Sequence, residues 1–156
     1  MNHRHPSSPI PIPSDLHIHP GPALLSGIEN GSSLEAHRAQ YGALPKLHLD
    51  ELADRVERLR LRGRGGAAFP FAIKLRTAAE GRKPVIVVNL SEGEPASGKD
   101  SALVMTRPHL ILDGAVITAR ALKAIEIHLV LPGDRPSVGA AMHRALAERQ
   151  DKIRIH

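Results

Sequence analysis

The sequence predicts an α/β domain with a small, partly parallel sheet and flanking helices. Apolar strand-like runs occupy 84–89 and 125–131, and patterns of helical spacing stand before, between and after them. Residues 152–156 begin as a third strand. From residue 71 onward helices alternate with strands, which is the order of a parallel sheet joined by helical crossovers.

Apolar residues at helical spacing predict helices over 34–42, 49–60, 71–80, 108–122 and 135–150. In the helix over 108–122, the expected buried face consists of Leu110, Ile111, Gly114, Ile117, Thr118 and Ala121. The run 84–89 is continuously apolar and rich in β-branched residues, which is typical of a strand buried on both faces.

The first 31 residues differ from the rest of the chain in composition. They hold many of the 13 prolines and four of the 10 histidines, with little periodicity, so residues 1–31 are expected to form an extended or disordered, flexible arm. Residues 32–156 then form the α/β domain. His17 and His19 alternate as two ligands on one strand face would, but further ligands are missing, so no metal site is expected.

Composition excludes several classes of function. The chain has no cysteine, so it cannot hold a disulfide or a cysteine-bound iron–sulfur cluster within these residues. A net charge of +5 permits nucleic-acid binding, but only 2% of the residues are aromatic, which leaves no stacking platforms for single strands. No apolar run is long enough to cross a membrane. We expect a cytoplasmic protein with no nucleic-acid partner and no membrane insertion.

A glycine-rich loop between two predicted helices is the first candidate site. Gly63, Gly65 and Gly66 stand beside Arg62 and Arg64. Glycine lets a ligand approach the backbone, and the helix that follows offers free N–H groups to a phosphate. Lys74, one turn into that helix, adds a charge that can fold back toward the loop. The pattern predicts a site for a phosphate-bearing cofactor; the alternative is a flexible turn.

The polar loop after the strand 84–89 is the second candidate site, because ligands favour the carboxyl ends of parallel strands. Asn89 offers an amide that can pair with a heterocycle edge, and Glu92 and Glu94 offer acceptors for ribose hydroxyls or a carboxamide. The alternative is a solvent loop rich in turn-forming residues.

The same loop is similar to a P-loop. Residues 93–100 read G-x-x-x-x-G-K-D, one residue short of a complete pattern. Asp100 stands where a P-loop has the Ser or Thr that holds Mg²⁺. Leu110–Asp113 looks like a Walker B strand, but its spacing favours a helix. A P-loop-like nucleotide-binding protein is therefore the less favoured hypothesis.

Several separated motifs together resemble one family. They are the loop 61–70, Lys74, the strand end at Asn89, the segment 92–95, Lys99 with Asp100, and Pro108 with His109. From about residue 45 to 156 the chain resembles the first half of the flavin domain in the FMN- and NADH-binding flavoprotein subunit of respiratory NADH:quinone oxidoreductase (complex I). The resemblance implies a Rossmann-like half of a flavin-binding domain.

The resemblance also implies roles for individual residues. FMN and the diphosphate of NADH would be lined by the loop residues Gly63, Arg64, Gly65, Gly66 and Ala67. Phe69 would stack on the adenine of NADH. Lys74, Asn89 and Ser91 fall on FMN-contacting positions, and Glu94 falls near the nicotinamide, with Glu92 beside it. FMN and NAD(H) are the cofactors implied, and the chemistry implied is hydride transfer from NADH to FMN.

Four departures from the family pattern qualify these implications. Ser91 replaces an Asp at a flavin-contacting position, Leu90 replaces a small residue, and Ala68 replaces a loop glycine. The family's second half of the flavin domain has no counterpart in these residues, so the domain is expected to be truncated at its C-terminus and the pocket incomplete. Hydride transfer would then require the missing half, supplied for example by a partner protein. The alternative is a non-catalytic protein-interaction module that keeps the fold.

Overall fold

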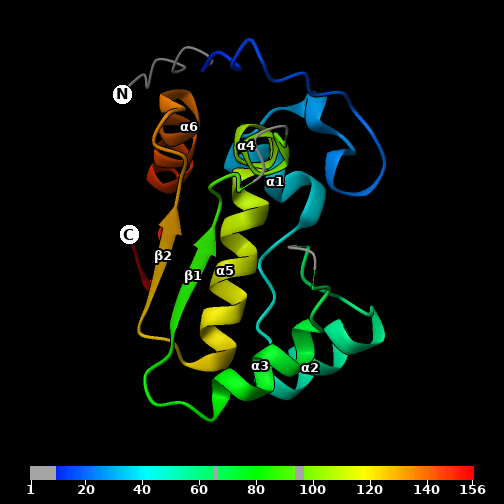
Figure 1. The fold of residues 1–156 in the computed structure, drawn as a ribbon, viewed down its shortest axis with the longest axis vertical. Helices are drawn as coiled ribbons and strands as arrows, with labels where there is room; N and C mark the ends of the chain where they lie inside the picture. The colour runs from blue at the N-terminus through cyan, green and yellow to red at the C-terminus, as the bar shows by residue number, and fades with distance from the viewer. Residues whose placement is uncertain (1–9, 65–66, 94–96) are drawn as a thin grey trace.

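The computed structural model describes residues 10–64, 67–93 and 97–156. Its sheet contains β1 (Val85–Asn89), β2 (Glu126–Val130) and β3 (Arg154–Ile155), in the order β1-β2-β3. Both pairings are parallel: Val85 pairs with Glu126, and Glu126 pairs with Arg154. The predicted α/β class and the third strand are confirmed (Figure 1).

The helices follow the predicted order, with one addition. The bounds are α1 (Leu34–Tyr41), α2 (Leu49–Arg58), α3 (Phe71–Ala79), α4 (Lys99–Thr106), α5 (Pro108–Leu122) and α6 (Pro136–Ala147). The sequence did not predict α4, because its beginning was assigned to the polar loop after β1. Two short 3₁₀ turns, Ala23–Leu25 and Ile28–Asn30, precede α1. Within the described ranges, no helix is long and apolar enough to cross a membrane.

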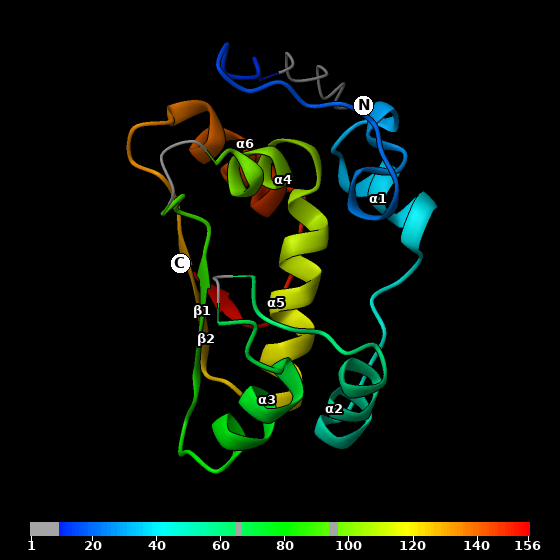
Figure 2. The same cartoon turned by 45° about the vertical axis from the view of Figure 1, so that its right-hand side comes forward.

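In the described part of the chain, helices cover one face of the sheet and leave the other uncovered. Ile86, Val88 and Ile127 pack against Val116 and other residues of α5, which lies along this face (Figure 2). On the opposite face, Val85 is 42% exposed and Val87 is 63% exposed. The prediction that β1 is buried on both faces is therefore wrong. An apolar run shows that a strand can be buried, but it does not show whether a second layer of helices is present.

The buried face of α5 also differs from the prediction. Leu112, Val116 and Ala119 are almost completely inaccessible, whereas Leu110, Ile111, Ile117, Thr118 and Ala121 are only partly buried and Gly114 is exposed. The true face is displaced around the helix because it also includes His109 and Asp113, which are polar and yet buried. A pattern of apolar residues alone leaves such positions out.

The described part of the N-terminal arm lies over α4 and α6 (Figure 1). Ile10, Leu16 and Ile18 pack against the core beneath it. Arg107, between α4 and α5, donates hydrogen bonds to the carbonyl oxygens of Leu24 and Ser26. These contacts attach the arm to the domain at several points, while its flexibility and the boundary at residue 31 stay predictions.

Candidate functional site

The glycine-rich loop is closed at its base by a short antiparallel pairing. Arg62 forms an isolated bridge with Pro70. The Gly63 N–H donates to the Phe69 carbonyl at 2.9 Å, and the Phe71 N–H donates to the Leu61 carbonyl at 2.9 Å. The loop therefore begins and ends at one place, directly before α3. Gly65 and Gly66 lie outside the described residues.

Exposed groups surround the described ends of this loop. Arg64 and Ala67 are exposed, and Phe69 is 49% exposed. Lys74 is exposed in the first turn of α3. Neither Lys74 nor Arg64 makes an ion pair within the described residues. Unpaired cations and an exposed ring beside accessible backbone suit an anionic, aromatic ligand.

Ala68 has a backbone conformation that favours glycine. Its φ is +46°, in the left-handed region, where the Cβ of an L-residue crowds the following carbonyl. Gly63, in contrast, does not have a positive φ, and a Cβ there would meet only ordinary contacts at 3.8 Å from Phe69. Among the described residues of the loop, the position that needs glycine most thus carries alanine.

The end of β1 makes a compact turn around Asn89. The side-chain oxygen of Asn89 accepts hydrogen bonds from the Ser91 N–H at 3.1 Å and the Ser91 hydroxyl at 2.7 Å. The amide nitrogen of Asn89 has no partner among the described residues, and the residue is exposed. The amide N–H of Asn89 therefore remains available to a ligand, while its side-chain oxygen is hydrogen-bonded to the Ser91 hydroxyl.

Glu92 binds the N-terminus of α4. Its carboxylate accepts the N–H groups of Asp100 at 3.1 Å and Ser101 at 3.3 Å, and the Ser97 hydroxyl at 3.0 Å. Burial alone would raise the pKa of Glu92, but these hydrogen bonds outweigh it and lower the pKa. The side chain is only 10% exposed. The carboxylate thus fills the place at the helix N-terminus that a phosphate would take.

This contact argues against the P-loop hypothesis. A P-loop presents the first N–H groups of its helix to the nucleotide phosphates. Here the N–H groups of Asp100 and Ser101 already bind a carboxylate, and Leu110–Asp113 lies in α5 rather than in a strand. Glu94 lies outside the described residues.

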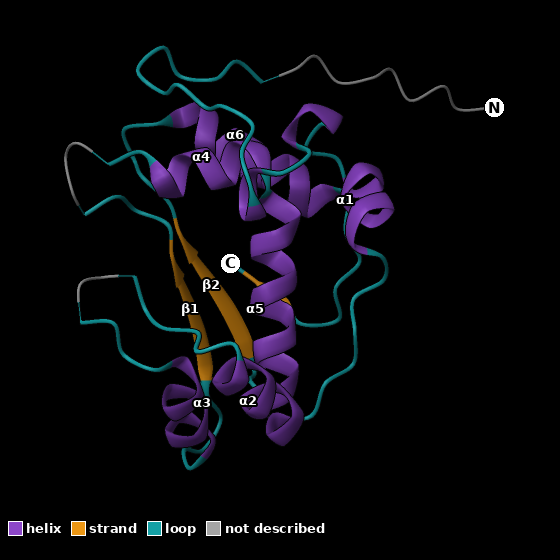
Figure 3. Ribbon diagram, turned by 90° about the vertical axis from the view of Figure 1, so that its right-hand side faces the viewer, coloured by secondary structure: helices purple, strands orange, loops and turns teal. Residues whose placement is uncertain are grey.

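The two loops lie on the same side of the molecule. In Figures 2 and 3 the described ends of the loops 61–70 and 90–98 both project to one side of α5, next to β1. β1 is an edge strand of the described sheet. Where β1 and β2 end, a cavity of about 320 Å³ is lined by Ser91, Glu92, Ser97 and residues 131–135. The residues named from the first loop do not line it.

Comparison with known proteins identifies the family. Residues 56–156 match the family described as the Nuo51 FMN-binding domain. The chain belongs to this family. Among its relatives, an NADH-quinone oxidoreductase subunit of Rhizobium meliloti is 32% identical over 130 residues, covering 82% of this chain and 30% of the relative. An NADH-quinone oxidoreductase subunit of Aquifex aeolicus is 33% identical over 116 residues, covering 72% of this chain and 27% of the relative.

A solved structure agrees with these relatives. An NAD⁺-reducing NiFe-hydrogenase in its air-oxidised state aligns with a TM-score of 0.62 at 28% identity, covering 86% of this chain and 24% of that one. The resemblance stated from the sequence is thus confirmed at the level of family and fold. The chain spans less than a third of the length of the curated relatives it matches.

Proposed function

We propose that this chain contributes one wall of a site for FMN and NADH. The observation that supports the proposal is that the described ends of the glycine-rich loop and the end of β1 project to the same side of a domain of the Nuo51 FMN-binding family. The exposed, unpaired cations there suit the phosphate of FMN and the diphosphate of NADH.

The residues divide by the part of the ligand that their chemistry suits. Arg64 and Lys74 would bind phosphate, with the backbone of Gly63 and Ala67 close by. Phe69 offers a half-exposed ring for the adenine of NADH. Asn89 would donate its amide N–H to the flavin, beside Ser91. Gly65, Gly66 and Glu94, outside the described residues, keep the roles that the family pattern predicts, whereas Glu92 supports the site by holding α4.

FMN, when bound, accepts a hydride from NADH, and this chemistry belongs to the cofactors. These residues would bind and orient the two ligands. The other walls of the FMN and NADH site come from polypeptide outside these residues, which would meet this domain at the free edge of β1. The relatives of this chain are named as subunits, so a partner subunit is one source of those walls. A cytoplasmic location fits this role.

Titration of FMN against the full chain tests the proposal. Contacts from one wall only should give weak binding, with a dissociation constant on the order of 100 µM. Flavin fluorescence should be quenched, and the melting temperature should rise with FMN concentration because the ligand binds only the folded state. Lys74→Ala and Arg64→Ala should each weaken binding several-fold.

Lys46→Ala is the matched control, since it removes an exposed lysine from the segment between α1 and α2, across α5 from the loops. It should leave FMN binding unchanged. If millimolar FMN neither quenches nor stabilises the chain, or if all three variants bind equally, the loops do not form a flavin site.

A non-catalytic interaction module is the second candidate function. The uncovered apolar face of β1, with Val85 and Val87 exposed, is the observation that favours it. The flavin titration separates the two candidates. A folded chain that takes up no FMN but co-purifies with an electron-transfer protein would support the interaction module.

A further inference from the structure

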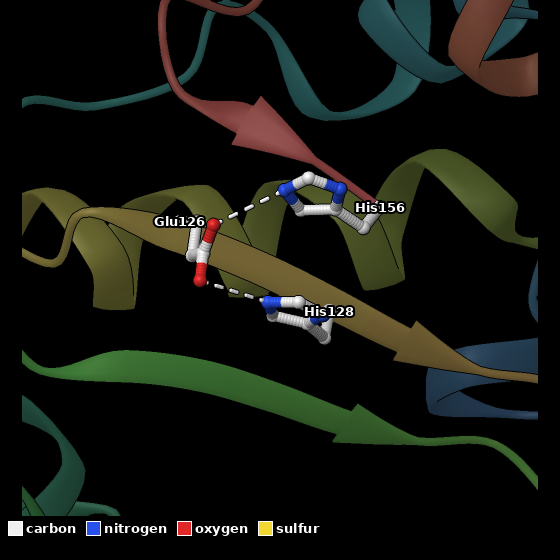
Figure 4. A group of neighbouring side chains, drawn as sticks. All are labelled: Glu126, His128 and His156. Carbon is white, nitrogen blue, oxygen red and sulfur yellow. Dashed lines mark hydrogen bonds and ion pairs between the residues drawn. The ribbon is translucent and has the colours of Figure 1, made fainter.

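Three potential metal ligands converge on the uncovered face of the sheet. Glu126 and His128 are two residues apart in β2, so their side chains point to the same face. His156 follows β3 and continues its pairing: its N–H donates to the Ile127 carbonyl at 2.9 Å, and its carbonyl accepts the Leu129 N–H at 2.8 Å. Two hydrogen-bonded strands thus fix the backbone beneath all three side chains (Figure 4).

The ligand atoms lie close together. The Nε2 atoms of His128 and His156 each lie 3.1 Å from a different oxygen of the Glu126 carboxylate. One ligand atom from each residue falls within 4.8 Å of the others. For comparison, ligand atoms about 2.0–2.1 Å from a tetrahedral Zn²⁺ stand roughly 3.3 Å apart. Small side-chain rotations would therefore bring all three into coordination distance of one ion.

The two imidazole rings stack with centroids 4.7 Å apart and an interplanar angle of 16°. Both rings direct Nε2 toward the single carboxylate, as Figure 4 shows.

We propose that Glu126, His128 and His156 form a binding site for a divalent transition-metal ion such as Zn²⁺. Two imidazoles and a carboxylate suit Zn²⁺ and its neighbours, whereas Ca²⁺ and Mg²⁺ prefer sites made of oxygen alone. The side chains are 29–42% exposed, so water completes the coordination. The site has three protein ligands and at least one exchangeable position.

Metal binding would strengthen the attachment of β3 to β2 at the edge of the sheet. β3 has only two residues, and its pairing with β2 is short. An ion held by Glu126 and His128 on β2 and by His156 after β3 cross-links the two strands. The ion binds the folded arrangement in preference to the unfolded chain, so it should raise the melting temperature.

Calorimetric titration of ZnCl₂ into the full chain tests the site. One ion should bind per chain at micromolar concentration, with the oligomeric state of the protein unchanged. Glu126→Gln, His128→Ala and His156→Ala should each weaken binding at least tenfold, because each removes one of three ligands. All three side chains lie on a solvent-facing surface, so the variants should fold as the unmodified chain does.

Two controls address exposed histidines elsewhere in the chain. His143→Ala removes a histidine from α6, and the double variant His17→Ala/His19→Ala removes two of the four histidines of the N-terminal arm. Both should bind Zn²⁺ as the unmodified chain does. Binding that these controls abolish, or that the three ligand variants leave unchanged, would overturn the proposal.

A Co²⁺ titration gives a readout that requires no variant. Coordination by two imidazoles and a carboxylate should produce visible absorption bands typical of a low-coordinate Co²⁺ site, and excess Zn²⁺ should remove them. Absorption that stays that of the hydrated ion, or two chains joined per ion, would exclude a site made within one chain.

Discussion

The junction of α1, α5 and α6 and the loops beside β1 use charged residues in opposite ways. At the junction, Asp113 is 11% exposed and is bound by His37 at 2.8 Å, Arg38 at 2.7 Å and Arg149 at 2.8 Å. Beside β1, Arg64 and Lys74 are exposed and have no ion-pair partner among the described residues. Buried charges that neutralise one another hold the fold, whereas accessible unpaired charges remain for a ligand.

The junction shows why α1 stays on the domain. The buried residue of α1 is His37, so this helix contributes little apolar surface to the core. Its polar attachments include the contacts of His37 and Arg38 with Asp113 and a hydrogen bond from the Leu34 N–H to the Glu148 carboxylate at 2.6 Å. Arg149 extends the cluster to Asp151 at 2.6 Å, and His109 to Glu148 at 3.2 Å. Burial lowers the pKa of His109 despite that neighbouring carboxylate.

Removing the central carboxylate should have the largest effect. Asp113→Ala leaves the buried guanidinium of Arg149 and the side chain of Arg38 without their shared partner, which should lower the free energy of unfolding by about 3–5 kcal/mol. Urea denaturation measures the change. Asp54→Ala is the control: it removes an exposed carboxylate, 3.4 Å from Arg76, and should cost less than about 1 kcal/mol. Equal costs for both variants would contradict the contrast between buried and exposed charges.

Acid should weaken the same cluster. Burial would raise the pKa of Asp113, but hydrogen bonds from Arg38, His37 and Arg149 outweigh it and lower the pKa from 3.8 to about 2. A lowered pKa gives stability that is present above about pH 4 and is lost as pH falls toward 2, by about 2 kcal/mol in all. Unfolding curves between pH 6 and 2 should show this loss.

Asp113→Asn supplies the comparison for the acid series. Its stability should be lower at pH 6 and should fall less steeply toward pH 2, because the titrating group is absent. Parallel curves for the variant and the unmodified chain would mean that other carboxylates cause the acid sensitivity.

The sequence predicted those features that depend on residues close together in the chain, and it missed those that depend on residues far apart. Local patterns predicted the strands, five of the six helices and the family motifs, because spacing and turn residues act over a few positions. His37, Asp113 and Arg149 are far apart in sequence, so nothing local predicted their cluster. The alternation Glu126-x-His128 marks one strand face, but its meeting with His156 depends on the register of β2 and β3. The individual roles of the loop residues stay predictions.

α4 was missed for the same physical reason. Its first N–H groups are satisfied by Glu92, seven residues before the helix begins at Lys99, rather than by an adjacent capping residue. Glu92→Gln keeps the shape of the side chain but removes the charge that favours a helix N-terminus. We expect a loss of about 1 kcal/mol. Thermal unfolding measures it, and Glu80→Gln, at an exposed position after α3, should change stability little. A loss equal to that of the control would mean that Glu92 does not hold α4.

The smallest expected effect tests the ligand-facing region by changing its backbone. Ala68→Gly relieves the strain of φ +46°, which is worth about 1–2 kcal/mol. Glycine also raises the entropy of the unfolded chain, which offsets part of this gain, so we expect the free energy of unfolding to rise by about 0.5 kcal/mol. Ala79→Gly makes the same substitution at the end of α3 and should instead cost about 0.5–1 kcal/mol. Opposite signs from one chemical change would show that the loop conformation, not glycine itself, decides the outcome. If Ala68→Gly also tightens FMN binding while Ala79→Gly does not, the strained residue lies where the ligand approaches; a loss of stability at both positions would exclude the left-handed conformation at Ala68.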